Sequence, residues 1–173
     1  NMKLIRFGQI GQEKPGVQLA DETRIDVSAF GEDFTPEFFA TDGPTRLEAW
    51  LNNNADSAPR VAEGTRLSHP VTKPGKIICV GLNFKDHAEE GGMEAPAEPV
   101  SFVQATSSLV GPNDDLMSPR GSEKTAWEVE LALIIGKRAS YVEKDEALDY
   151  VAGYCLHNDY SERAYQLERC GQW

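Results

Sequence analysis

Residues 127–135 constrain the fold more than any other segment of the chain. They read Trp-Glu-Val-Glu-Leu-Ala-Leu-Ile-Ile, with an apolar residue at every odd-numbered position. This alternation predicts a β-strand whose core face carries the odd-numbered side chains. Glu128 and Glu130 then share the opposite face, which continues into the apolar residues Ala132 and Ile134. The expected strand therefore places two carboxylates about 7 Å apart at the start of a face that becomes apolar.

Two enclosed carboxylates at this spacing repel each other, and a cation bound between them would offset that repulsion. A hard divalent ion such as Mg²⁺, Mn²⁺ or Ca²⁺ accepts carboxylate oxygens and keeps positions open for water and substrate. Asp159 offers a third ligand, because it follows a mostly apolar strand at a point where functional groups often project. Two simpler interpretations stay open: Glu128 and Glu130 are solvated side chains of a half-exposed strand, and Asp159 caps the helix expected after it.

A second candidate group lies in residues 81–90, where the sequence predicts a strand end followed by a short helix capped by Asn83. His87 and Glu90 are three residues apart and would share one face of that helix. Glu90 would then orient the imidazole while His87 takes a proton from water or substrate. The alternative is a capped surface helix with an exposed histidine.

Arg163 and Gln166 form a third candidate group, on the helix expected after Asp159. Their spacing of three residues places them on one helix face, where they could hold a substrate carboxylate. They could equally belong to the solvated side of an amphipathic helix.

Proline and glycine divide the chain into two expected domains. Pro70, Pro74 and Gly75 punctuate the sequence and predict a boundary between them. We therefore expect a small β-rich accessory domain over 1–72 and a second domain over 73–173.

The expected elements make this an α+β chain that is mainly β. In the first domain we expect three short strands and two helices, within 4–10, 16–20, 24–27, 36–40 and 44–53. In the second domain we expect four strands, at 77–82, 100–103, 127–135 and 151–157. Short helices are expected there as well, at 84–90, 145–150 and 161–170.

Composition limits the classes of partner. Seventeen basic and 28 acidic residues give a formal net charge of -11, which opposes binding to nucleic acid or to an anionic membrane. The apolar runs are far shorter than the roughly 20 residues that span a bilayer, and the N-terminus lacks the apolar core of a signal peptide. A cytoplasmic protein is expected. Cys79, Cys155 and Cys170 are widely spaced, which predicts reduced thiols rather than a disulfide framework or a zinc cluster.

Taken in order, four motifs closely resemble the fumarylacetoacetate hydrolase family. They are Gly81-Leu82-Asn83-Phe84-x-x-His87-x-x-Glu90, Glu98-Pro99, Trp127-Glu128-Val129-Glu130-Leu131 and Asn158-Asp159-x-Ser161-x-Arg163-x-x-Gln166. The likeness extends from Lys76 to Trp173, and the preceding residues resemble the accessory domain of bacterial members. It implies a mixed β-sandwich roll, and the style of the motifs is similar to bacterial 2,4-dioxo sugar-acid hydrolases and to proteins called ureidoglycolate lyases. Because family members continue beyond the position of Trp173, a fragment of the catalytic domain is expected.

The resemblance also implies a site and a reaction. Glu128, Glu130 and Asp159 would bind Mg²⁺, or Mn²⁺ or Ca²⁺, and the ion would bind a small 2-oxo acid. His87 with Glu90 would activate a water, and the remaining two candidates, Arg163 and Gln166, would lie near the substrate. The implied function is hydrolysis of a carbon-carbon bond in a 2,4-dioxo acid by a homodimer.

Other functions remain open at this point. Within the family, ureidoglycolate lyase, oxaloacetate decarboxylase and 2-hydroxy-dienedioate isomerase share the same motifs. A non-catalytic metal- or small-acid-binding protein, or an inactive fragment, is the alternative of a different class.

Overall fold

The computed structural model describes residues 2–92, 94–169 and 171, and of His87 only the backbone. The strands are β1 (Lys3–Phe7), β2 (Lys14–Gln18), β3 (Arg24–Asp26), β4 (Leu67–Ser68), β5 (Ile77–Gly81), β6 (Val100–Gln104), β7 (Thr125–Ala126), β8 (Val129–Ile135), β9 (Val151–Asn158) and β10 (Ser161–Glu162). The helices are η1 (Ser28–Phe30), α1 (Pro36–Ala40), α2 (Gly43–Asn54), α3 (Lys85–Glu90), η2 (Thr106–Ser108), η3 (Ala147–Tyr150) and η4 (Ala164–Glu168).

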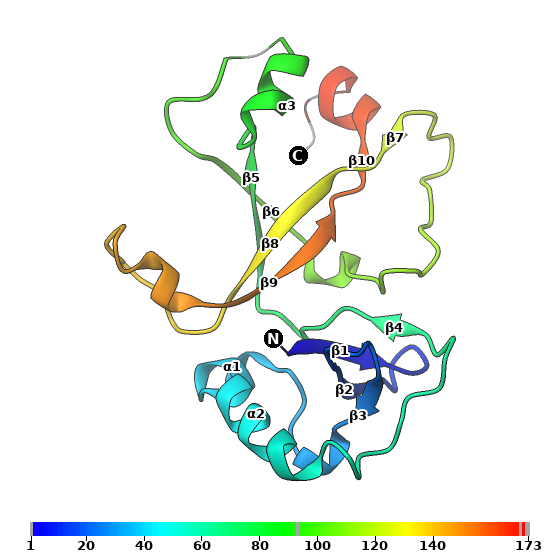
Figure 1. The fold of residues 1–173 in the computed structure, drawn as a ribbon. Coiled ribbons are helices and arrows are strands. Elements are labelled where there is room, and N and C mark those ends of the chain that lie inside the picture. Colours follow the sequence, from blue (N-terminus) through cyan, green and yellow to red (C-terminus); the bar gives the residue numbers. More distant parts are fainter. Residues whose placement is uncertain (1, 93, 170, 172–173) are drawn as a thin grey trace.

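The N-terminal region is an antiparallel sheet covered by two helices, and it forms the lower part of Figure 1. The strand order is β3-β2-β1-β4. Helix α1 begins after Thr35, whose hydroxyl accepts a hydrogen bond from the backbone nitrogen of Phe38 at 3.2 Å, and Pro36 stands in the first turn, where its missing N–H costs nothing. The buried core joins the sheet to the helices through Val17, Ile25, Val27, Phe34, Phe38, Phe39 and Leu47.

The described residues beyond β4 form three two-stranded antiparallel sheets, β5–β6, β8–β9 and β7–β10. In Figure 1 the β8–β9 ribbon crosses β5–β6, and the connection that contains η3 projects as an arm. The register of β8–β9 pairs Glu130 with His157 and Leu131 with Leu156. This register fixes which side chains share a face, and thereby positions the candidate site.

Contacts from strand β8 and from the loop between β6 and β7 join the regions. Ile134 of β8 packs against the N-terminal core. The guanidinium of Arg66, just before β4, donates to both carboxylate oxygens of Asp114, at 2.7 and 2.6 Å, and so ties the loop between β6 and β7 to the N-terminal sheet. Gly111 lies in that loop, and a Cβ there would come within 2.2 Å of the carbonyl oxygen of Leu67. The close approach of loop and strand therefore requires glycine at this position.

Most of the expected elements are present, with bounds that shift by a few residues. The expected helix at 36–40 matches α1, and the strands expected at 77–82, 100–103 and 151–157 correspond to β5, β6 and β9. The helix expected at 145–150 is the shorter 3-10 helix η3. The proposed boundary between the two domains stays a prediction.

The core face expected for residues 127–135 was wrong. Strand β8 begins only at Val129, and its odd-numbered side chains are exposed, with 62% of Val129, 57% of Leu131 and 47% of Leu133 accessible. The opposite face of β8 is the less exposed one, because its residue Ile134 packs against the N-terminal core.

The helix expected at 161–170 was also wrong over its first turn. Ser161 and Glu162 form strand β10, which pairs with Thr125 and Ala126 of β7, and the Glu162 carboxylate accepts hydrogen bonds from the hydroxyls of Ser122 and Thr125. These long-range contacts replace the helical backbone bonds of that turn. Among the residues described after β10, the helical segment is the short π-helix η4, and Arg163 stands at its N-cap. Asp159 therefore does not cap this helix.

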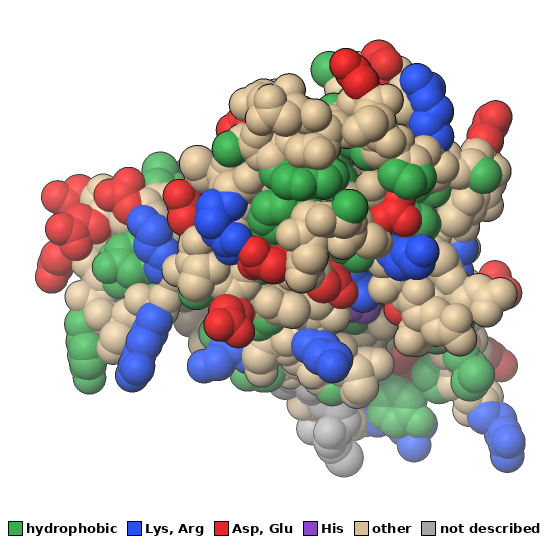
Figure 2. Space-filling view, turned by 90° about the horizontal axis from the view of Figure 1, so that it is seen from below, with side chains coloured by type: hydrophobic (Ala, Val, Ile, Leu, Met, Phe, Trp, Pro, Cys, Tyr) green, Lys and Arg blue, Asp and Glu red, His purple; other side chains and the backbone are tan. Residues whose placement is uncertain are grey.

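On the face of the molecule seen from below in Figure 1, the Lys and Arg side chains of the described residues are interspersed with Asp and Glu (Figure 2). Within the described ranges, no helix has the length and apolar character needed to cross a membrane.

Candidate metal centre

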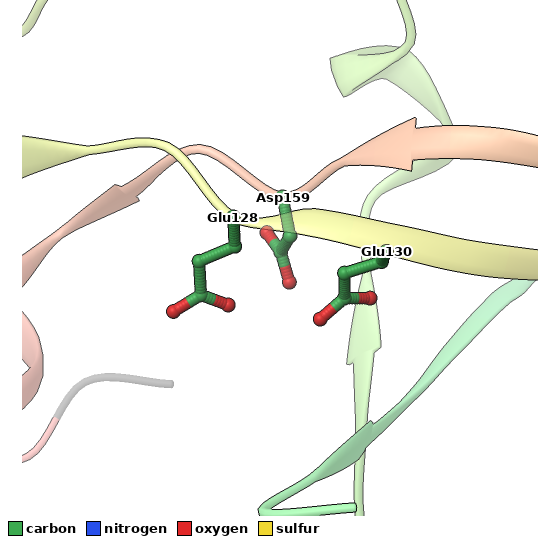
Figure 3. A group of neighbouring side chains, drawn as sticks. All are labelled: Glu128, Glu130 and Asp159. Atoms are coloured by element: carbon green, nitrogen blue, oxygen red, sulfur yellow. The ribbon is translucent and has the colours of Figure 1, made fainter. Parts of the chain in front are cut away.

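Three acidic residues meet where β8 begins and β9 ends. Glu130 lies in β8, Glu128 lies in the connection before that strand, and Asp159 directly follows β9. The backbone nitrogen of Asp159 donates to the carbonyl oxygen of Glu128 at 2.9 Å, which continues the pairing beyond the strands. All three carboxylates point to the same side, with Asp159 between the two glutamates (Figure 3). One oxygen from each lies within 4.8 Å of the others.

The composition of this cluster suits a hard divalent cation. Asp159 is only 4% exposed, and both glutamates are partly buried. Carboxylates held this close in a partly desolvated place repel one another, and a cation removes that cost. Three carboxylates are oxygen donors of the kind that Mg²⁺, Mn²⁺ and Ca²⁺ prefer, and three protein ligands leave coordination positions for water or substrate. The residues present therefore fit a divalent metal ion.

The negative charge of the cluster affects the pKa of Cys79, which lies in the neighbouring sheet. It lies in β5 and is 7% exposed. Burial, together with the nearby charges of Asp159, Glu130 and Glu128, raises the pKa of the Cys79 thiol to about 11. Burial also raises the pKa of Cys155. Both thiols are free and protonated near neutral pH, as expected for structural cysteines, and Cys170 lies outside the described residues.

Arg163 reaches the cluster through Glu128. Its guanidinium donates to a carboxylate oxygen of Glu128, and a second nitrogen donates to the side-chain oxygen of Gln166 at 2.6 Å. The structure thus brings together the two residues that the sequence placed on one helix face, although a π-helix carries Gln166. Arg163 offsets part of the negative charge, and Gln166 fixes the direction of the guanidinium.

Asn158 and Gln104 make hydrogen bonds to residues of the cluster, and the sequence analysis gave neither of them a role. The side-chain oxygen of Asn158 accepts a hydrogen bond from the backbone nitrogen of Glu128 at 3.0 Å. The amide nitrogen of Gln104, in β6, donates to the carboxylate of Asp159. Asn158 stands beside Asp159 in the recognised motif, so its position could have suggested a role at the site. Gln104 is 55 residues distant from Asp159, and only the fold brings the two together.

The predicted acid–base pair is only partly visible. The His87 side chain lies outside the described residues, and Glu90 is exposed on α3 and is not a member of the carboxylate cluster. Its pairing with His87 stays a prediction. A different histidine lies beside the cluster: His157 pairs with Glu130 across the two strands, and its Nε2 is buried without a hydrogen-bond partner among the described residues.

Comparison with known protein families gives one match, which covers residues 76–173. The matching family is described as fumarylacetoacetate (FAA) hydrolase C-terminal. Two relatives, from Burkholderia multivorans and Burkholderia ambifaria, are each 48% identical to this chain over 172 residues, and both carry provisional names as hydrolases. The match covers 99% of this chain and 60% of each relative.

Solved structures show the same likeness. A fumarylacetoacetate hydrolase from Exiguobacterium antarcticum is 31% identical with a TM-score of 0.74, over 99% of this chain and 60% of that one. A protein from Mycobacterium abscessus, provisionally named a 2-hydroxyhepta-2,4-diene-1,7-dioate isomerase, is 27% identical with a TM-score of 0.71, over 96% of this chain and 54% of that one. These structures confirm the expected fold class, and this chain spans about 60% of the length of the curated relatives it matches.

Proposed function

Because the chain belongs to the fumarylacetoacetate hydrolase family, we propose that it carries the metal-binding part of an enzyme that hydrolyses a carbon-carbon bond in a small 2,4-dioxo acid. The observation that supports this most directly is the cluster of Glu128, Glu130 and Asp159, with Arg163 beside it. An acylpyruvate or a sugar-derived diketo acid is the substrate class we propose.

The three carboxylates would hold Mg²⁺, or Mn²⁺ or Ca²⁺. A divalent cation bound there supplies electrostatic stabilisation of the negative charge that develops on the 2-oxo acid during bond cleavage. Arg163 would contribute a guanidinium that recognises a carboxylate oxygen of the substrate, and its hydrogen bond to Gln166 keeps it directed toward the cluster.

His87, oriented by Glu90, would remove a proton from a water molecule. That water adds to the carbonyl farther from the substrate carboxylate. The bond between this carbonyl carbon and the neighbouring methylene carbon then breaks, and its electron pair stays on the methylene carbon, which takes up a proton. The products are a carboxylic acid and a 2-oxo acid, so one water is consumed and no oxidant is needed.

A second candidate function is isomerisation of a 2-hydroxy-dienedioate. It is favoured by the provisional name of the Mycobacterium abscessus structure. Oxaloacetate decarboxylation and ureidoglycolate cleavage would use the same carboxylate cluster, and binding of a metal and a small acid without turnover is the alternative of a different class. We also propose a homodimer from the family likeness alone, and a stable, active monomer in sedimentation would contradict it.

The test is turnover of a panel that contains acylpyruvates, sugar-derived 2,4-dioxo acids, a 2-hydroxy-dienedioate, oxaloacetate and ureidoglycolate. Each substrate is offered with Mg²⁺ or Mn²⁺, and again with a chelator, to this chain and to the full-length Burkholderia multivorans relative. Chelator-sensitive hydrolysis of a dioxo acid by both proteins supports the proposal. Hydrolysis by the relative alone assigns the reaction to the longer protein, and metal binding without turnover by either favours the non-catalytic alternative.

Two substitutions examine the ligand set. Glu128→Ala and Glu130→Ala each remove one carboxylate and should abolish both metal content and metal-dependent turnover. Glu143→Ala serves as the matched control, because it removes an exposed glutamate from the arm between β8 and β9. Retention of metal by both cluster variants would show that the ligands lie elsewhere.

A further inference from the structure

Gln104 connects two sheets at the most buried acid of the cluster. It is the last residue of β6 and pairs with Ile77 of β5. Cys79, Phe102 and Gln104 all occupy the less exposed face of the β5–β6 pair. From this face the Gln104 side chain reaches across to Asp159, at the end of β9.

The chemistry of the two groups fixes the direction of this hydrogen bond. An ionised carboxylate only accepts hydrogen bonds, so the amide must present its nitrogen to Asp159. The bond occupies Oδ1 of Asp159, while the backbone nitrogen of the same residue is held by the carbonyl oxygen of Glu128. Both the main chain and the side chain of Asp159 are therefore fixed, which limits rotation of the carboxylate.

Gln104 differs from Arg163 in the charge that it brings. Arg163 adds a positive charge beside Glu128, which attracts the carboxylate but also competes with a cation for it. The amide of Gln104 is neutral, so it orients Asp159 without reducing the negative charge that a cation would meet. Removal of a residue that hydrogen-bonds to a metal ligand typically weakens metal binding by about 10- to 100-fold.

We propose that Gln104 is a positioning residue for the metal centre, which holds the Asp159 carboxylate in the orientation that a divalent cation requires. This inference rests on the proposed function, because it assumes that the cluster binds a cation. It assigns Gln104 no contact with substrate. Its effect is expected in metal affinity, and any change in turnover would follow from metal occupancy.

The experiment measures Mn²⁺ affinity of the 173-residue chain by equilibrium dialysis, with free Mn²⁺ counted by electron paramagnetic resonance. Gln104→Met keeps the length of the side chain and removes its donor. Gln104→Asn keeps a neutral amide that is one carbon shorter and cannot span the same distance. Gln18→Met is the matched control, since Gln18 also makes a side-chain hydrogen bond, to Arg24 at 3.0 Å, but in the N-terminal sheet. Thermal unfolding of each metal-free variant shows whether it is folded.

We expect both Gln104 variants to bind Mn²⁺ about 10- to 100-fold more weakly than the wild type and the Gln18→Met control to bind it equally well. Saturating Mn²⁺ should restore the occupancy of the Gln104 variants, and unchanged thermal unfolding of the metal-free chains would exclude a folding defect as the cause of weaker binding. Wild-type affinity in a folded Gln104→Met or Gln104→Asn chain would overturn the positioning role and leave the proposed function standing. A wild-type chain that binds no Mn²⁺ would overturn both.

Discussion

The N-terminal region and the region that carries the carboxylate cluster are stabilised by different kinds of interaction. The N-terminal region has a closed apolar core, in which Phe34, Phe38 and Leu47 are at most 1% exposed. In the region that carries the carboxylate cluster, Asp159 is among the most buried side chains, whereas Leu131 and Leu156 of the β8–β9 pair are 57% and 83% exposed. The first region is thus stabilised by apolar burial, and the second positions its site through strand register and polar contacts.

The strongest test of this difference compares one apolar side chain from each region. Phe38→Ala should lower the free energy of unfolding by about 3–5 kcal/mol, because it leaves a cavity in the N-terminal core. Leu131→Ala should change it by no more than about 0.5 kcal/mol, because the side chain is largely in water. Urea unfolding measures both. A large loss for Leu131→Ala would mean that the outer face of β8 is covered in solution, and the contrast would fail.

A divalent cation should sharpen the difference, because it would stabilise only the region that binds it. At a free Mn²⁺ concentration of about 100 times its dissociation constant, binding contributes about 2.7 kcal/mol. Hydrogen exchange should therefore slow by up to about 100-fold in β8 and β9, provided that they exchange through opening of the cluster. Exchange in β1 and β2 should stay as it was. Equal protection of both regions would show that they unfold as one unit.

The buried thiol of Cys79 provides a probe of the second region that needs no metal. Its pKa of about 11, against 9.0 for an ordinary cysteine, leaves about 100-fold less thiolate at pH 8. Alkylation by iodoacetamide should be slower by at least that factor than in the urea-unfolded chain, and should accelerate as the pH rises toward 11. Peptide mass spectrometry separates Cys79 from the other cysteines. Rapid alkylation at pH 8 would show that this region opens easily.

Local patterns predicted the elements of this fold better than their surroundings. Helix α1 was predicted over its full length, and the structure shows that its start is set locally, by the Thr35 N-cap and by Pro36 in the first turn. The alternation in residues 127–135 predicted the strand and placed Glu128 and Glu130 on one face, which the structure confirms. Alternation does not say which face is buried, since that depends on partners distant in sequence. The exposed side of β8 was therefore assigned wrongly.

The residues of the site likewise differ in whether local sequence could predict them. The carboxylates could be predicted because they stand in strand-like or motif-like segments. The spacing of Arg163 and Gln166 predicted a shared side, and the structure adds a hydrogen bond between them. Gln104 could not be predicted, because nothing local distinguishes it from any other glutamine at the end of a strand. Its role depends on the crossing of two sheets. The same holds for β10, where pairing with β7 replaced the first turn of the expected helix.

The smallest expected effect concerns the Arg66–Asp114 ion pair, one of the contacts that join the two regions. Hydrogen bonds from Arg66 and from the backbone of Gly111 hold the pKa of Asp114 below its ordinary value of about 3.9. Because this pKa is lowered in the folded chain, the resulting stabilisation is present above about pH 4 and is lost as the pH falls through the lowered value. Acid should therefore release the loop around Gly111 from β4.

Limited proteolysis of this loop with an acid-active protease, followed from pH 5 downward, measures its release. Asp114→Asn should make the loop cleavable already at pH 5. Glu32→Gln is the matched control, because it weakens an ion pair with Arg46 that lies entirely within the N-terminal region. If the control variant and the wild type release the loop at the same pH while Asp114→Asn releases it earlier, the Arg66–Asp114 contact joins the regions. If all three behave alike, packing of Gly111 against β4 and of Ile134 against the N-terminal core is sufficient to hold them together.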